Sequence, residues 1–95
     1  MNIFETVRLM NTSETERARP LLRALDHLDR GEWQKAHGIV QELESQEAYW
    51  LHGIVHILEG DMENARYRYG RAQRPFCEDA TSERAAARSV LTAPR

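Results

Sequence analysis

The sequence predicts an all-α protein with two tandem helix-turn-helix hairpins and flanking N- and C-terminal helices. Two observations predict this fold. The chain resembles itself when it is shifted by 29 residues, which places Gly31 on Gly60, and such a period is typical of helical repeats. Within each unit, apolar residues recur every three or four positions, which produces one apolar helix face. The 95 residues suffice for one domain, which we place at residues 1–95.

The turn of each hairpin falls at a glycine, Gly31 or Gly60, because glycine readily takes the left-handed conformation that ends a helix. Asp61 is expected to cap the helix after the second turn, and Ser45 the first helix of the second unit. Pro20 suits a first helical turn. These signals place the hairpin helices at about 20–30, 32–44, 47–59 and 61–73.

Two further helices are expected outside the hairpins. A short leading helix covers residues 3–10, and Ser13 and Glu16 after it have the spacing of a capping box. A last helix covers about residues 80–92. Its apolar lid is expected to consist of Val90 and Leu91.

The segments Gly31–Ala36 and Gly60–Ala65 resemble the turn and the start of the second helix in tetratricopeptide repeats. Their last residues, both alanines, match the small residue at which the two helices of that repeat cross. Tyr49 and Gly53 match its aromatic and small residues on the first helix. The resemblance covers about residues 18–75, with a period shorter than the usual ~34 residues. It implies a stack of helical hairpins.

A longer pattern resembles a group of small, uncharacterised bacterial proteins. Ile57 and Arg68 stand where that group usually carries arginine and tryptophan. The resemblance implies a helical-repeat fold and no known activity. The matching residues are Trp33, Ala36, His37, Gln41, Trp50, His52, His56, Glu59, Gly60, Asp61, Asn64, Ala65, Tyr67 and Tyr69.

The most suggestive motif for chemistry is His52-x-x-x-His56, which a helix places on one face together with Tyr49 and Glu59. Two imidazoles four positions apart can bind one divalent metal ion. Glu59 lies one turn further on and can complete or orient such a site, and His37 on the neighbouring helix is a candidate third ligand.

The same residues allow two other interpretations. The repeat places Tyr49, Gly53 and His56 where one helix packs against its partner, so the histidines can be structural. Buried imidazoles then need hydrogen-bond partners, for which Tyr67, Asn64 and backbone carbonyls are candidates. The third interpretation is a polar binding pocket. The candidate binding residues are Trp33, His37, Tyr49, His52, His56, Glu59 and Tyr67, with His52 and His56 as the metal ligands.

Other classes of function have little support in the sequence. Cys77 has no histidine close to it in sequence, and no serine lies in a nucleophile motif, so the protein is not expected to be an enzyme. Arg66, Arg68, Arg71 and Arg74 follow one another along a helix with Tyr67 and Tyr69. We expect these arginines to form a solvated flank that pairs with acids of neighbouring helices. Tyr69 is expected in the core, and nucleic-acid binding is not expected.

Composition favours a bacterial, cytoplasmic protein. A single cysteine suits a reducing compartment, and no apolar run approaches the roughly 18 residues of a membrane span. The preference for arginine over lysine suggests a GC-rich bacterial genome. Stacked hairpins usually need about three units to bury a continuous core, so two units favour a protein-interaction or self-association module without a cofactor. The alternative is a small-ligand or metal-binding protein that uses the His-x-x-x-His site.

Overall fold

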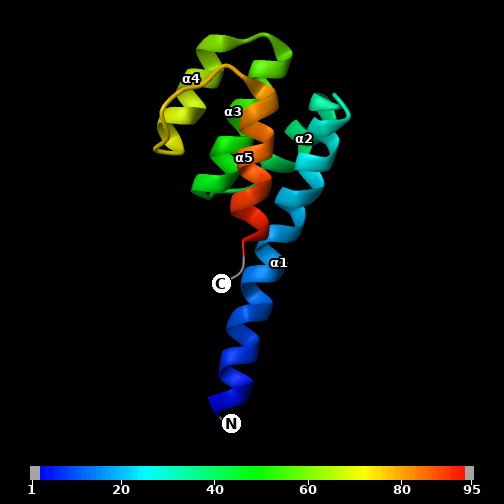
Figure 1. Ribbon diagram of the computed structural model, residues 1–95, viewed down its shortest axis with the longest axis vertical. Coiled ribbons are helices and arrows are strands. Elements are labelled where there is room, and N and C mark those ends of the chain that lie inside the picture. Colours follow the sequence, from blue (N-terminus) through cyan, green and yellow to red (C-terminus); the bar gives the residue numbers. More distant parts are fainter. Residues whose placement is uncertain (1–2, 94–95) are drawn as a thin grey trace.

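The computed structural model describes the backbone of residues 3–93 and the side chains of residues 16–93. Within this part the chain is helical, without a strand, which confirms the all-α class (Figure 1). The helices are α1 (Ile3–Asp29), α2 (Trp33–Val40), α3 (Gln46–Glu59), α4 (Met62–Arg71) and α5 (Ala80–Thr92).

Helix α3 lies at the centre and contacts the other four helices. All eight residues from Trp50 to Ile57 are buried, so this helix is covered on every side over two turns. Helix α1 also packs on α2, and α5 packs on α1. The apolar run of α3 therefore organises the whole core, because each neighbouring helix covers a different part of it.

The expected turns and caps are confirmed. Gly31 and Gly60 have φ angles of +74° and +89°, in the left-handed region. The Ser45 hydroxyl accepts a hydrogen bond of 3.1 Å from the Ala48 amide at the start of α3. The Asp61 carboxylate accepts one of 3.2 Å from the Asn64 amide at the start of α4. These short-range signals fix where both hairpin turns occur.

Helix α1 corrects the prediction of two separate helices at 3–10 and 20–30. It is one continuous helix, and Pro20 lies inside it, so no helix begins after Ser13 and Glu16. Proline removes one hydrogen bond and strains the preceding turn, but residues 3–19 contain neither glycine nor proline and sustain the helix up to it. The N-terminal half of α1 projects beyond the other helices (Figure 1).

The second helix is shorter than the predicted 32–44. Helix α2 ends at Val40, its last buried residue, and the chain turns through Gln41 and Glu42, which are exposed. The turn is closed by hydrogen bonds from the Glu42 amide to the Ile39 carbonyl and from the Leu43 amide to the Val40 carbonyl. The turn places Leu43 partly buried against the core and leads the chain to the start of α3.

Gly53 marks the point where α3 and α4 cross. A Cβ atom at this position would lie 2.5 Å from Cδ1 and 2.7 Å from Cε1 of Tyr69, and 3.4 Å from the Ala65 carbonyl oxygen. Ala36, Ala65 and Tyr69 are buried, as expected for crossing and core positions. The absence of a side chain at residue 53 therefore lets the Tyr69 ring lie directly against the α3 backbone.

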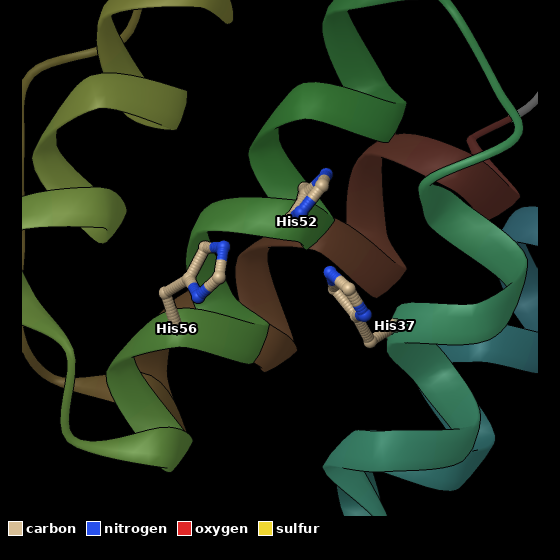
Figure 2. A group of neighbouring side chains, drawn as sticks. All are labelled: His37, His52 and His56. Atoms are coloured by element: carbon tan, nitrogen blue, oxygen red, sulfur yellow. The ribbon is translucent and has the colours of Figure 1, made fainter.

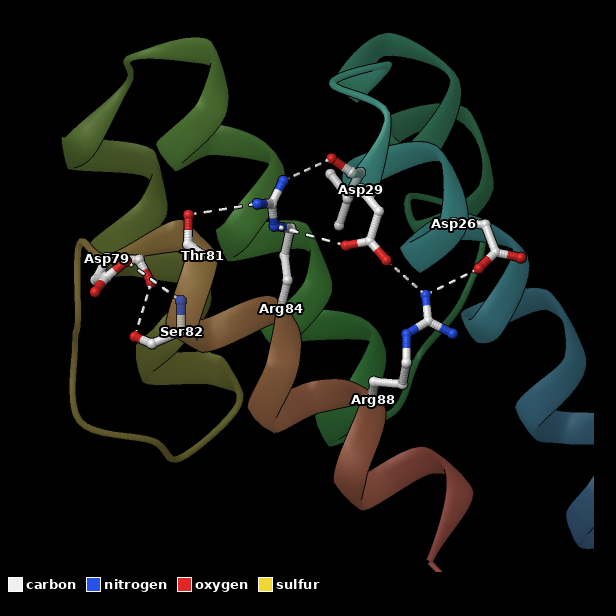
Figure 3. Close-up of polar contacts among 8 residues, drawn as sticks. Asp26, Asp29, Asp79, Thr81, Ser82, Arg84 and Arg88 are labelled. Carbon is white, nitrogen blue, oxygen red and sulfur yellow. Dashed lines mark hydrogen bonds and ion pairs between the residues drawn. The ribbon is translucent and has the colours of Figure 1, made fainter.

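Polar contacts attach α5 to the C-terminal part of α1 (Figure 3). The Arg84 guanidinium donates a 2.9 Å hydrogen bond to the Leu28 carbonyl near the end of α1. Arg88 forms ion pairs of 2.9 Å with Asp26 and 2.7 Å with Asp29. Arginines suit this position because the carbonyls at a helix C-terminus carry partial negative charge.

The residues of α5 that face the core differ from the predicted pair, Val90 and Leu91. Val90 is 39% exposed, whereas Ala87 is fully buried and Leu91 is partly buried against the core. Glu83 lies on the same side and accepts hydrogen bonds from Trp50 Nε1 at 3.2 Å and from the Tyr69 hydroxyl at 2.7 Å. The small alanine allows close approach of α5, and the carboxylate satisfies two ring donors of the core.

Candidate metal centre

Three histidines from two helices lie together beside α3. His37 comes from α2, and His52 and His56 come from successive turns of α3 (Figure 2). The ring centroids are 4.8 Å apart for His37 and His52, 5.0 Å for His52 and His56, and 5.7 Å for His37 and His56. The two histidines of the sequence motif are thus joined by His37, the candidate third ligand.

His56 is oriented by the next turn of its own helix. Its Nδ1 atom lies 2.9 Å from a carboxylate oxygen of Glu59. A carboxylate accepts hydrogen bonds, so Nδ1 is the donor in this contact, and the neutral form of the ring then has its lone pair on Nε2. Metal-binding histidines commonly have such a carboxylate partner, which sets the ring orientation and raises the basicity of the ligand nitrogen.

His52 is the most deeply buried member of the cluster, with 4% of its surface exposed. Its Nε2 atom is buried and has no hydrogen-bond partner. Burial, followed by the positive charge of Arg68 and the neighbouring histidines, lowers the pKa of His52 to about 3. The ring is therefore neutral at physiological pH, and no bound proton competes for its lone pair.

The three side chains approach the arrangement of a metal site. Their ligand atoms lie within 4.8 Å of one another. A tetrahedral zinc ion binds nitrogen at about 2.0–2.1 Å, which places its ligand atoms about 3.3 Å apart. Small side-chain rotations would therefore bring the imidazoles onto one ion. Three histidines leave one position of a tetrahedral ion open for water or another ligand.

A second group near α4 contains His56, Glu59 and Asp61 within the same distance limit. Its two carboxylates already have partners. Glu59 contacts His56, while Asp61 accepts hydrogen bonds from the backbone and side-chain amides of Asn64. This group is better explained as the outer support of His56 and the cap of α4 than as a second ion site.

The remaining predicted binding residues have other contacts. Arg71 donates hydrogen bonds to the hydroxyls of Tyr49 at 3.2 Å and Tyr67 at 3.3 Å. Tyr67 is 54% exposed, and Trp33 is partly buried against the core. The expected hydrogen bonds from the histidines to Tyr67 or Asn64 are not found among the described side chains, where His56 contacts Glu59 instead.

The arginines of α4 and the segment after it correct another expectation. Within residues 16–93 their ion pairs with acids are absent, and each guanidinium lies over an aromatic ring. Arg74 lies 3.5 Å from the centroid of Trp50, and the corresponding distance from Arg71 to Tyr49 is 4.7 Å. Flat guanidinium groups stack favourably on rings. Arg66 and Arg68 lie over Phe76 and Tyr67, at 4.3 and 5.2 Å.

Arg68 is the residue near the candidate site that the sequence reasoning missed. Its Nε atom is buried without a hydrogen-bond partner. Its sequence neighbours do not predict that its charge acts on His52, because this effect depends on how α4 packs against α3. Only the packing of the two helices reveals it.

Comparison with known proteins adds no relative. No protein-family model, no curated protein and no solved structure matches the chain. Both resemblances drawn from sequence motifs therefore stay predictions. Among the described residues, no helix is both long and apolar enough to cross a membrane. Functional inference therefore depends on the geometry of the histidine cluster.

Proposed function

We propose that this protein binds one divalent transition-metal ion through His37, His52 and His56. The observation that carries the proposal is the convergence of three imidazoles from two helices, with ligand atoms within 4.8 Å of one another. Imidazole nitrogens suit zinc, copper, nickel and iron. Glu59 would act behind His56 as the orienting carboxylate.

The orphan nitrogen of His52 favours this function over purely structural histidines. A buried polar atom in a core normally has a hydrogen-bond partner, because leaving it unpaired costs about 1–3 kcal/mol. The Nε2 atom of His52 has none, although the centroids of the His37 and His56 rings lie 4.8 and 5.0 Å from that of the His52 ring. In the tautomer that has its proton on Nδ1, a metal ion would bind the lone pair of this atom and offset the cost of burying it.

The proposal is tested by titrating metal-free protein with Zn²⁺ in a calorimeter and by counting the bound ions. One ion per chain is expected for the wild type, and His52→Gln should lose most of the affinity. Saturation at 100 times the dissociation constant should stabilise the fold by about 2.7 kcal/mol, which raises Tm on the order of 10–20 °C.

His27→Gln is the matched control. His27 occupies the position of His56 in the first unit and also contacts a carboxylate, because its Nδ1 lies 2.9 Å from Glu32. It belongs to neither candidate ligand group among the described residues. This variant should bind zinc like the wild type. Absence of stoichiometric zinc binding, or equal losses in both variants, would contradict the proposal.

A second proposal concerns association with other proteins. We propose that α1 with α2, and α3 with α4, are two tetratricopeptide-like hairpins that form a self-association module. The supporting observation is the N-terminal half of α1, which extends beyond the helices that could cover it (Figure 1). Analytical ultracentrifugation tests the proposal. A dimer or larger species supports it, and a protein that stays monomeric over a 100-fold range of concentration contradicts it.

A further inference from the structure

Two buried polar atoms without partners lie on the two helices that cross at Gly53. Among the described residues, the buried side-chain nitrogens without a hydrogen bond are those of His52, Arg68 and Arg84. Arg84 is otherwise satisfied, because its terminal nitrogens donate to Leu28 and Thr81. His52 on α3 and Arg68 on α4 have no such compensation at these atoms.

Among the described arginines of α4, Arg68 is the one with a buried guanidinium nitrogen that has no hydrogen-bond partner. It precedes Tyr69, whose ring contacts the α3 backbone at Gly53, so it lies next to the crossing of α3 and α4 along the chain. Its guanidinium carbon lies 5.2 Å from the centroid of the Tyr67 ring. None of the ion pairs found among the described residues includes Arg68.

A metal ion beside this arginine would add a second positive charge next to one that has no ion-pair partner among the described residues. Two cations in a partly buried site repel each other, with an energy that grows as the dielectric constant falls. An anion bound to the metal removes this conflict, because it can also accept the hydrogen bond that Arg68 Nε lacks. The guanidinium group is planar, and its donors match the oxygens of carboxylates and phosphates.

We infer that the histidine cluster, once metal is bound, takes a small oxyanion as a further ligand, and that Arg68 holds this anion by its guanidinium group. The ligand chemistry is a carboxylate or a phosphate group. The inference rests on the proposed metal site, in which three histidines leave a coordination position open. Arg68 is thus a specificity-determining residue of the site, since it selects anions over neutral ligands.

The test uses protein loaded with Co²⁺, whose visible absorption changes when a ligand enters its coordination sphere. Sodium phosphate and sodium acetate are titrated separately at constant ionic strength. At least one should change the spectrum of the wild type in a saturable way, and the more effective salt identifies the class of anion. In Arg68→Met, the affinity for that anion should fall by about ten- to a hundredfold, because a charge-assisted hydrogen bond is lost.

Cobalt affinity provides the internal control. In Arg68→Met, cobalt should bind as well as in the wild type or better, because a positive charge has been removed beside the ion. Arg68→Lys keeps the charge without the planar donors and should lie between the two in anion affinity. Circular dichroism checks that both variants are folded.

The possible results separate the two proposals. If the wild type binds no cobalt, the proposed metal site and the oxyanion are both wrong. If it binds cobalt but neither anion changes the spectrum, only the oxyanion is wrong. Equal anion affinity in the wild type and Arg68→Met also overturns the role of Arg68 while leaving the metal site intact.

Discussion

Replacing Gly53 by alanine should destabilise the protein, although alanine is the better helix former. The new Cβ atom would lie 2.5 Å and 2.7 Å from two ring carbons of Tyr69, whereas carbons in contact pack at about 3.5–4.0 Å. The ring or the helix must therefore move by about 1 Å. The ring has little freedom to do so, because it is buried and its hydroxyl donates to Glu83 at 2.7 Å.

The two opposing terms can be compared. Overpacking a core costs about 1–3 kcal/mol, and the pinned ring places this site at the upper end. Alanine in place of glycine inside a helix stabilises the helix by about 1 kcal/mol. We expect a net loss of about 2 kcal/mol in the free energy of unfolding, which lowers Tm by roughly 8–16 °C in a domain of this size.

Urea unfolding of Gly53→Ala and Gly38→Ala measures this difference. Gly38 also lies in a helix, but a Cβ atom there would meet nothing within 4 Å, so its replacement should stabilise the protein by up to about 1 kcal/mol. In a Tyr69→Leu background the penalty of Gly53→Ala should shrink, because the ring is gone. If Gly53→Ala is as stable as Gly38→Ala, the close approach of Tyr69 to α3 is refuted.

Three further predictions concern stability. In metal-free protein, folded His52 has its pKa lowered from 6.5 to about 3. The stability that depends on its neutral ring is therefore present above pH 6.5 and is lost as the pH falls toward 3, by up to about 1.4 kcal/mol per pH unit. His52→Gln should flatten that part of the pH–stability curve. Glu83→Leu should cost about 2–5 kcal/mol in denaturant unfolding, because it leaves the buried donors of Trp50 and Tyr69 without an acceptor, while a cost below about 1 kcal/mol would show that these bonds are dispensable. Asp61→Ala should lower stability by about 1 kcal/mol through loss of the α4 cap, with Asp61→Asn nearly neutral; equal losses in the two variants would argue against the capping role.

Features that depend on neighbouring residues could be predicted from the sequence. The glycine turns at Gly31 and Gly60 and the caps at Ser45 and Asp61 each depend on about four consecutive residues, and all are present. The extent of α1 could not be predicted in this way. Pro20 is compatible with a helix start and with a helix interior, and its local pattern does not distinguish them.

The residues of the candidate site also differ in how far the sequence predicts them. The spacing of His52 and His56 follows from helix geometry, and His37 was a plausible neighbour once α2 and α3 were expected to pack together. The role of Arg68 could not be predicted, because it arises from burial of one nitrogen between two helices. The stacking of Arg74 on Trp50 could not be predicted either, because an arginine in such a segment can form an ion pair as readily as an aromatic contact.

The attachment of α5 to α1 has a consequence for how the protein forms during translation. The contacts of Arg84 with Leu28 and of Arg88 with Asp26 join residues 56 and 62 positions apart. Ribosomes synthesise α5 after the other four helices, so the faces of α1 and α3 that it covers stay exposed in the nascent chain until then. Such exposed surface is prone to aggregation and chaperone binding. Docking of α5 also joins residues up to 62 positions apart among the described side-chain contacts, and contacts of such large sequence separation form slowly.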